Sequence, residues 1–100
     1  MNKQLVISHD KVMAEKLRAG PRFAAEYLKA AMEDTDDPEV LLIALRRVAE
    51  ARGGIARIAK AAGIERESLY RALSKRGNPR LSTLLGVMKA VGLKLTVEAA

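Results

Sequence analysis

Cysteine is absent from this 100-residue chain, histidine occurs once, and only three residues are aromatic. Without cysteine the chain has neither a disulfide framework nor a thiolate metal site. The single histidine, His9, cannot form a histidine metal cluster or a catalytic triad, and no serine lies in a nucleophile elbow. We therefore expect no enzymatic activity, no cofactor and no metal, and we interpret His9 as a surface residue near a helix start.

Long hydrophobic runs are also missing. The chain has no stretch of eighteen apolar residues and no signal-peptide pattern, so we expect neither a membrane span nor secretion and predict a cytoplasmic protein. A cluster of carboxylates lacks the glycine and the ligand spacing of a calcium loop, and we interpret it as a helix cap and linker. Its members are Glu33, Asp34, Asp36 and Asp37.

Positive charge is concentrated in the second half of the chain. The net charge is +6, yet residues 1–45 hold six Lys or Arg against eight Asp or Glu, whereas residues 46–100 hold twelve against four. Such a distribution is typical of nucleic-acid binding, although acidic lipid or an acidic protein would also be attracted. With 49% hydrophobic and 30% charged residues, the composition indicates one compact helical domain.

Helical spacing of apolar residues predicts the central helices. Asp37 is a candidate N-cap, Pro38 suits the first helical position, and Gly53 or Gly54 can end the helix in a left-handed conformation. The spacing i, i+3, i+4, i+7 occurs in three separate segments, and we expect the three faces to share one core. These faces are Leu41, Ala44, Leu45 and Val48; Ile55, Ile58, Ala59 and Ala62; and Leu81, Leu84, Leu85 and Met88.

The segment between the last two of these faces combines an apolar side with a polar stripe. We expect Leu69, Ala72 and Leu73 to face inward. The polar stripe consists of Glu67, Tyr70, Arg71 and Ser74. The sequence KRGNPR then interrupts the helical pattern, with Gly77 free to adopt a positive φ and Asn78 a candidate cap for the next helix.

Both ends of the chain contain β-prone segments. LKLTV at residues 93–97 alternates apolar and polar residues, and QLVI at residues 4–7 is the comparable segment near the start. We expect short terminal strands that pair either within one chain or across a dimer. Between them, Gly20 and Pro21 divide the N-terminal region into two short helices. The second carries Ala24, Tyr27, Leu28 and Ala31 along one face.

A helix, Gly63, the apolar Ile64 and a second helix follow the layout of a helix-turn-helix. In that geometry the N-terminal end of the second helix enters the major groove, where Arg66 can contact guanine and Glu67 can accept from cytosine. The free amides of the preceding helix, together with Arg57, can hold a phosphate. We predict further contacts to bases or to the DNA backbone from Ser68, Tyr70, Arg71, Lys75, Arg76 and Arg80.

The stretch IARIAKAAGIERESLYRALSKRGNPRLSTLLGVMKAVGLKLTV resembles the Xre or Cro-like helix-turn-helix, and more narrowly the HigA-like addiction-module antidote proteins. The resemblance covers roughly residues 22–98. It implies a dimeric antitoxin of a type II toxin–antitoxin system that represses its own operon and neutralises a RelE or ParE-like toxin. The DNA-contacting positions of the family carry over onto Arg66, Glu67, Ser68 and Arg71. Glu65 stands where the family often has a capping serine or threonine, so we expect a weaker helix start.

The expected fold class is therefore all-α: a compact helical bundle with an Xre/Cro-like helix-turn-helix and short terminal β-strands. We divide the single compact domain into an N-terminal extension, residues 1–37, and a helix-turn-helix part, residues 38–100. Two alternatives to the antitoxin remain open: a phage-type or free-standing repressor without a toxin, and a protein-sequestering module without DNA binding. Two site residues also have structural interpretations, because Tyr70 can cover the core edge and Glu67 can pair with Arg71.

Overall fold

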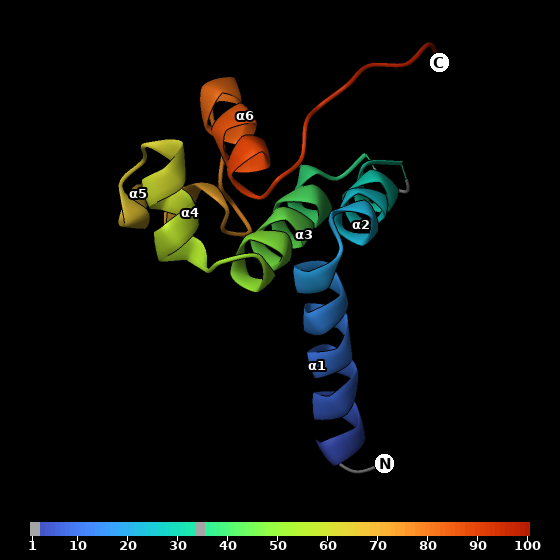
Figure 1. The fold of residues 1–100 in the computed structure, drawn as a ribbon. Coiled ribbons are helices and arrows are strands. Elements are labelled where there is room, and N and C mark those ends of the chain that lie inside the picture. Colours follow the sequence, from blue (N-terminus) through green and yellow to red (C-terminus); the bar gives the residue numbers. More distant parts are fainter. Residues whose placement is uncertain (1–2, 34–35) are drawn as a thin grey trace.

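The computed structural model describes residues 3–33 and 36–100, with side chains from Asp10 onward. Within these ranges the chain folds into six helices and no strand (Figure 1). They are α1 (Lys3–Ala19), α2 (Pro21–Glu33), α3 (Pro38–Ala51), α4 (Ile55–Ala62), α5 (Arg66–Ala72) and α6 (Leu81–Ala90). None of the described helices is both long enough and apolar enough to cross a membrane.

α3 begins where its sequence predicts. The carboxylate of Asp37 accepts a hydrogen bond from the backbone N–H of Glu39 at 3.0 Å, and Pro38 occupies the first turn. The side-chain oxygen thereby satisfies one of the amides that a helix start leaves without a partner. After the helix, Gly53 and Gly54 both adopt positive φ, so both predicted boundaries are confirmed.

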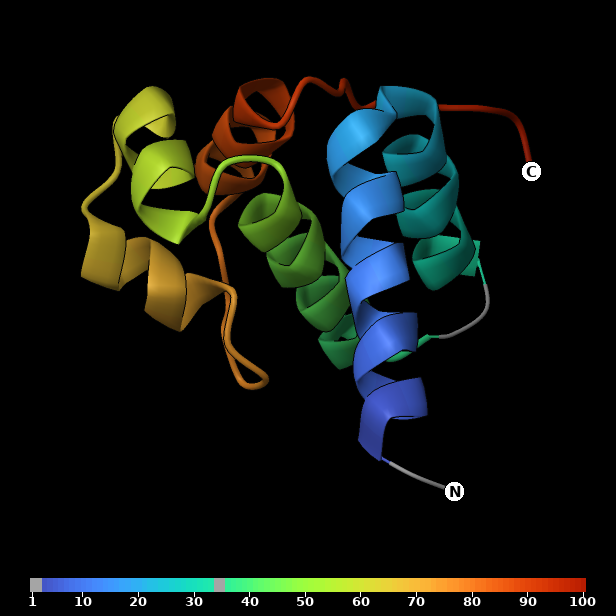
Figure 2. The same cartoon turned by 60° about the horizontal axis from the view of Figure 1, so that its bottom comes forward.

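The apolar face of α3 forms the centre of the core. α1 and α2 pack against one side of this helix, and α4 packs against it from the other side and also contacts α5 and α6 (Figure 2). The predicted faces of α3 and α4 are confirmed, since their residues are buried or half-buried. The fully buried large side chains come from five of the helices and the residues just after α5 and α6: Leu17, Leu45, Val48, Ile58, Leu69, Leu73, Val87 and Val91.

The N-terminal region forms two helices that meet at Gly20 and Pro21, as predicted. Ala24 and Leu28 of α2 are buried, and Tyr27 packs against the core edge. Arg47 of α3 donates a hydrogen bond to the Tyr27 hydroxyl at 3.4 Å, and this bond raises the pKa of Arg47. His9 lies within α1, but its side chain is outside the described residues, as is Asp34.

The predicted inner face of α6 is partly wrong. Leu81 and Leu85 are 65% and 45% exposed, whereas Val87 and Val91 are buried together with Met88. A leucine-rich helix offers two overlapping sets of residues at helical spacing, and periodicity does not distinguish between them. The packing of α6 against α4 selects the face that includes Val87 and turns Leu81 and Leu85 to solvent.

The predicted terminal strands are not seen among the described residues, and the expected pairing of the two ends within one chain is wrong. Residues 4–7 lie inside α1, and residues 93–97 are extended without strand pairing. Figure 1 shows the physical reason, because the two ends of the chain lie at opposite ends of the molecule and cannot pair with each other. Without a partner strand, residues 4–7 satisfy their backbone groups within a helix instead.

The turn between α5 and α6 depends on the close approach of two backbone segments at Gly77. A Cβ atom at this position would lie 2.0 Å from the carbonyl oxygen of Ala72, which is impossible without moving the backbone. The expected positive φ at Gly77 is wrong, so the glycine is needed for space rather than for its conformation. Asn78 does not cap α6, because that helix begins after Arg80 and has no side-chain cap.

One side chain joins the C-terminal ends of three helices. Arg52, at the C-cap of α3, donates from Nη1 to the carbonyl oxygens of Leu17 and Arg18, both at 3.0 Å. Its Nε donates to the carbonyl oxygen of Val91 at 2.6 Å. The last carbonyls of α1 and the end of α6 thus share one cation. The positive charge of this cation also interacts favourably with the partial negative charge at the C-terminal ends of these helices.

We predict that Arg52→Ala lowers the free energy of unfolding by about 2–3 kcal/mol, because two part-buried carbonyls and one exposed carbonyl lose a charged donor. The free energy of unfolding of Arg52→Lys should lie between those of the unmodified protein and Arg52→Ala, since a single ammonium cannot reproduce the planar set of donors of a guanidinium. Urea denaturation measures the effect. Arg22→Ala, at an exposed arginine of α2, is the matched control. Equal midpoints for Arg52→Ala and the control would contradict the role assigned to Arg52.

A second prediction compares two glycines. Gly77→Ala should destabilise the fold by about 2–3 kcal/mol, because the new methyl group forces the turn apart. Gly63→Ala should cost only about 1 kcal/mol, since Gly63 is left-handed but a Cβ there meets nothing within 4 Å. Thermal or urea unfolding of both variants tests the order. The reverse order would show that backbone conformation, not space, limits position 77.

Candidate nucleic-acid interface

α4 and α5 are joined by a short turn with Gly63 at its start. Gly63 has φ 70° and ψ 31°, the left-handed conformation that ends many helices. The backbone N–H of Ile64 donates to the carbonyl of Ala59 at 2.9 Å, which closes the turn, and the Ile64 side chain packs against the core. The predicted arrangement of two short helices around Gly63 and Ile64 is therefore present.

The N-terminal end of α4 has no side-chain cap. Gly54 is the N-cap, and no side chain bonds to the first amides of the helix. Arg57, in the first turn, is exposed, and it has no hydrogen bond or ion pair with any other residue that the structure describes. Open amides and a nearby cation are compatible with the predicted phosphate contact.

α5 presents its polar side chains to solvent because its apolar side is fully committed to the core. Leu69 is 0% exposed and Leu73, just past the helix end, is 1% exposed. On the outer side Arg66, Glu67 and Arg71 are exposed. The predicted division of this helix into an inner and an outer side is confirmed.

A chain of hydrogen bonds runs along the outer side of α5. Ser68 Oγ donates to Glu65 Oε1 at 3.2 Å, and Arg71 Nη2 donates to Ser68 Oγ at 3.5 Å. As expected, Glu65 is the N-cap but makes no capping bond to a backbone amide. Its carboxylate instead holds Ser68, which in turn orients Arg71.

Arg66 and Glu67 have no partner within the protein. Across the described residues no hydrogen bond or ion pair involves either side chain, and the interpretation of Glu67 as an ion-pair partner of Arg71 is not borne out. Both groups are exposed at the first turn of α5. Their charged groups are therefore available to a ligand without breaking an internal contact.

Tyr70 connects α5 to α3. Its hydroxyl accepts a hydrogen bond from Arg46 Nη2 at 2.6 Å, and the Arg46 guanidinium carbon lies 4.3 Å from the ring centroid. Arg46 is itself 3.6 Å from the carboxylate of Glu50 one turn later. Sequence reasoning missed the contact between Arg46 and Tyr70, because the two residues are 24 positions apart and both lie on polar sides of their helices.

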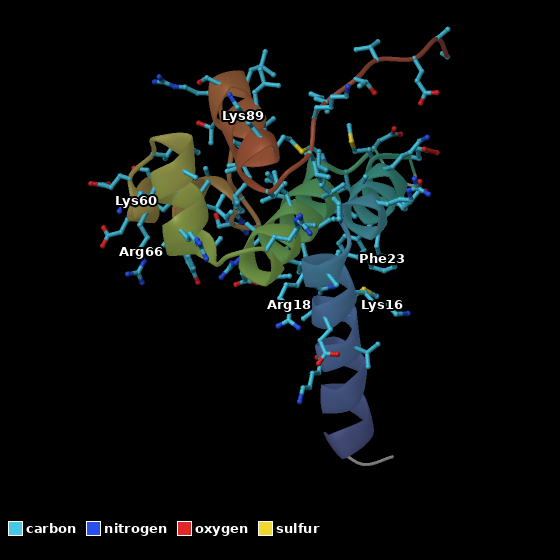
Figure 3. The ribbon with its side chains drawn as sticks, viewed as in Figure 1. Lys16, Arg18, Phe23, Lys60, Arg66 and Lys89 are labelled. Atoms are coloured by element: carbon cyan, nitrogen blue, oxygen red, sulfur yellow. The ribbon has the colours of Figure 1, made fainter. Side chains whose placement is uncertain are left out.

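The remaining predicted cations lie in the loop that follows α5. Lys75, Arg76 and Arg80 are all exposed. Lys60 of α4 is a further exposed cation that the sequence interpretation did not include, and Figure 3 shows it on the same side of the molecule as Arg66, away from α1. α4, α5 and the loop that follows α5 therefore each carry exposed positive charges.

Comparison with known proteins identifies the family. Residues 9–99 match a family model described as "probable addiction module antidote protein". An uncharacterized protein of Haemophilus influenzae (strain ATCC 51907 / DSM 11121 / KW20 / Rd) is 44% identical over 72 residues, which are 72% of each chain. No solved structure matches the chain. The chain belongs to the family of probable addiction module antidote proteins, the antitoxin side of toxin–antitoxin systems.

Proposed function

We propose that this protein is a homodimeric antitoxin that binds operator DNA in a sequence-specific manner and represses its own operon. The observation that supports DNA binding is the first turn of α5, where Arg66 and Glu67 are exposed and have no internal partner. On this proposal α4 and α5 form a helix-turn-helix of the Xre/Cro-like, HigA-like type. The protein acts by binding in the cytoplasm, not by catalysis.

The chemistry of the tip suits the major groove. An arginine makes two parallel hydrogen bonds to guanine, and a glutamate accepts from the amino group of cytosine. Arg71 donates a long, exposed hydrogen bond to Ser68 at 3.5 Å, and its guanidinium keeps further donors for the DNA. Reading of the sequence is therefore assigned to Arg66, Glu67 and Arg71.

The surrounding cations supply affinity without choice of sequence. Arg57 and the uncapped amides of α4 approach one phosphate, and Lys75, Arg76 and Arg80 approach the backbone beside the groove. Each cation that neutralises a phosphate releases counterions, so binding weakens steeply with salt.

Arg46 and Tyr70 have a positioning role in this proposal. The Tyr70 hydroxyl is already bonded to Arg46, and the ring is covered by the guanidinium. This contact fixes the outer side of α5 to α3, which is packed in the core. A preorganised reading helix loses less conformational freedom on binding DNA.

The toxin is proposed to be RelE-like or ParE-like. Family membership supports a toxin partner in general, and the resemblance of the sequence to HigA-like antidotes supports this narrower class. A two-fold symmetric dimer would present two α5 helices to half-sites about 34 Å apart on one side of the duplex.

We predict that Arg66→Ala plus Arg71→Ala abolishes recognition of the operator while the fold is retained. Fluorescence anisotropy on the DNA upstream of the gene should show an affinity loss of at least about a hundredfold, because two base or phosphate contacts are removed. The unmodified protein should prefer this DNA over scrambled DNA by roughly a thousandfold, with log affinity falling against log salt.

The matched control is Lys11→Ala plus Arg22→Ala, which removes two exposed cations from α1 and α2. This variant should bind operator DNA nearly as well as the unmodified protein. Equal losses in the two double variants would show that only total charge matters. Equal affinity of the unmodified protein for both DNAs would favour a sequestering module without DNA recognition.

A second prediction concerns the toxin. On this proposal an adjacent gene encodes the toxin. Co-expression with that protein should give a stable complex that co-purifies, and Arg66→Ala plus Arg71→Ala should leave that complex intact. Growth rescue of cells expressing the neighbouring protein provides an independent readout. Failure to bind or to rescue, together with retained operator binding, would identify a free-standing repressor instead of a toxin-neutralising protein.

A further inference from the structure

The residues after α6 form a tail that pairs with no strand among the described residues. Leu93 is tied down, since its backbone N–H donates to Met88 at 2.8 Å and its side chain packs against the core. In the part of the chain that the structure describes, residues 94–98 have no backbone hydrogen bond to another segment. The tail runs past α2 toward solvent (Figure 1), so its backbone donors and acceptors are open to pairing.

The tail also exposes apolar side chains that a partner would cover. Val97 is 95% exposed and Leu95 is 42% exposed. A groove of about 530 Å³ lies between the tail and α2, and it is lined by Met32, which is itself 49% exposed. Leucine, threonine and valine in alternation suit a strand, but an isolated strand is not stable in water.

We propose that the tails of two copies pair as antiparallel strands, with the two-fold axis passing through Thr96. With the axis at Thr96, a residue that precedes Thr96 in one copy lies opposite the residue that follows Thr96 by the same number of positions in the other copy. Lys94 therefore faces Glu98 of the second copy, and Leu95 faces Val97 of the second copy. In this register one face of the strand pair carries two opposite-charge pairs, with the two Thr96 residues opposite each other between them. The other face carries two apolar pairs.

Neighbouring registers lack this match. An axis through Leu95 would place Lys94 opposite Thr96, and an axis through Val97 would place Thr96 opposite Glu98, so neither forms an ion pair between the strands. Charge complementarity thus selects a second copy of this chain in one register, because an antiparallel pair of identical strands is what a two-fold axis generates. The inference rests on the homodimer of the proposed function and specifies the surface by which its copies meet.

The existing contacts of the tail do not oppose this pairing. Glu98 lies 3.6 Å from Lys29 of α2, but the two side chains are 73% and 57% exposed, and such an exposed pair contributes little. Glu98 can exchange Lys29 for Lys94 of the second copy at small cost. Figures 1 and 2 show the tail at the opposite end of the molecule from α5, so the pairing leaves the α5 tip of both copies uncovered.

The absence of cysteine permits a direct test of the register. Thr96→Cys places two thiols beside each other across the axis, where Cα atoms of paired strand residues are about 4.5–5.5 Å apart and within disulfide range. Mild oxidation of the full-length protein should give a mostly cross-linked dimer on a non-reducing gel. Val97→Cys, whose thiol faces Leu95 of the second copy, should cross-link several-fold less.

Charge reversal tests the same register without a covalent bond. Lys94→Glu puts two glutamates opposite each other at both ends of the pair, and sedimentation equilibrium should show dimerisation weakened by about tenfold or more. Lys94→Glu plus Glu98→Lys restores opposite charges and should recover most of the lost affinity. Circular dichroism checks that the helices of each variant are intact.

Two results would overturn the tail pairing: a protein that stays monomeric at high concentration, or a dimer in which Leu85→Cys on the exposed side of α6 cross-links and Thr96→Cys does not. The second result would leave the proposed DNA-binding dimer in place with a different interface. Conversely, tail cross-linking in a protein that shows no preference for its own operator would support the tail pairing and contradict the proposed function.

Discussion

The Arg52 guanidinium lies where the C-terminal ends of α1, α3 and α6 converge, and it bonds to the carbonyls of Leu17, Arg18 and Val91. These helices come from the first, middle and last parts of the chain, so one planar cation joins α1 and α3 to α6, the helix against which α4 packs. An arginine suits this position because its donors are rigidly arranged in one plane.

α3 extends this arrangement to the candidate DNA-binding helix. Its C-cap, Arg52, holds α1 and α6, and Arg46, six residues earlier, holds Tyr70 of α5. The buried face of the same helix occupies the centre of the core. α5 is too short to be stable alone, so its orientation depends on Leu69 and Leu73 within the core and on Tyr70 at its edge. The first turn of α5, with Arg66 and Glu67, is therefore held in a fixed position by the core and by α3.

Sequence reasoning succeeded where a residue type determines the local backbone structure without help from distant segments. Asp37 and Pro38 specify a helix start, Gly63 permits a left-handed turn, and Gly20 with Pro21 interrupts a helix. It failed where a partner decides the outcome. Periodicity could not tell which leucines of α6 would meet α4, and strand propensity at both chain ends could not show that the ends lie apart.

The sequence by itself determined the family, the concentration of positive charge after residue 45, and the outward placement of Arg66 and Arg71, because these follow from residue identity and helical spacing. Only the tertiary structure decided that Arg52 would join three helix ends and that Arg46 would cover Tyr70. Each of these contacts joins segments far apart in the chain, and local propensities carry no information about which distant groups packing will bring together.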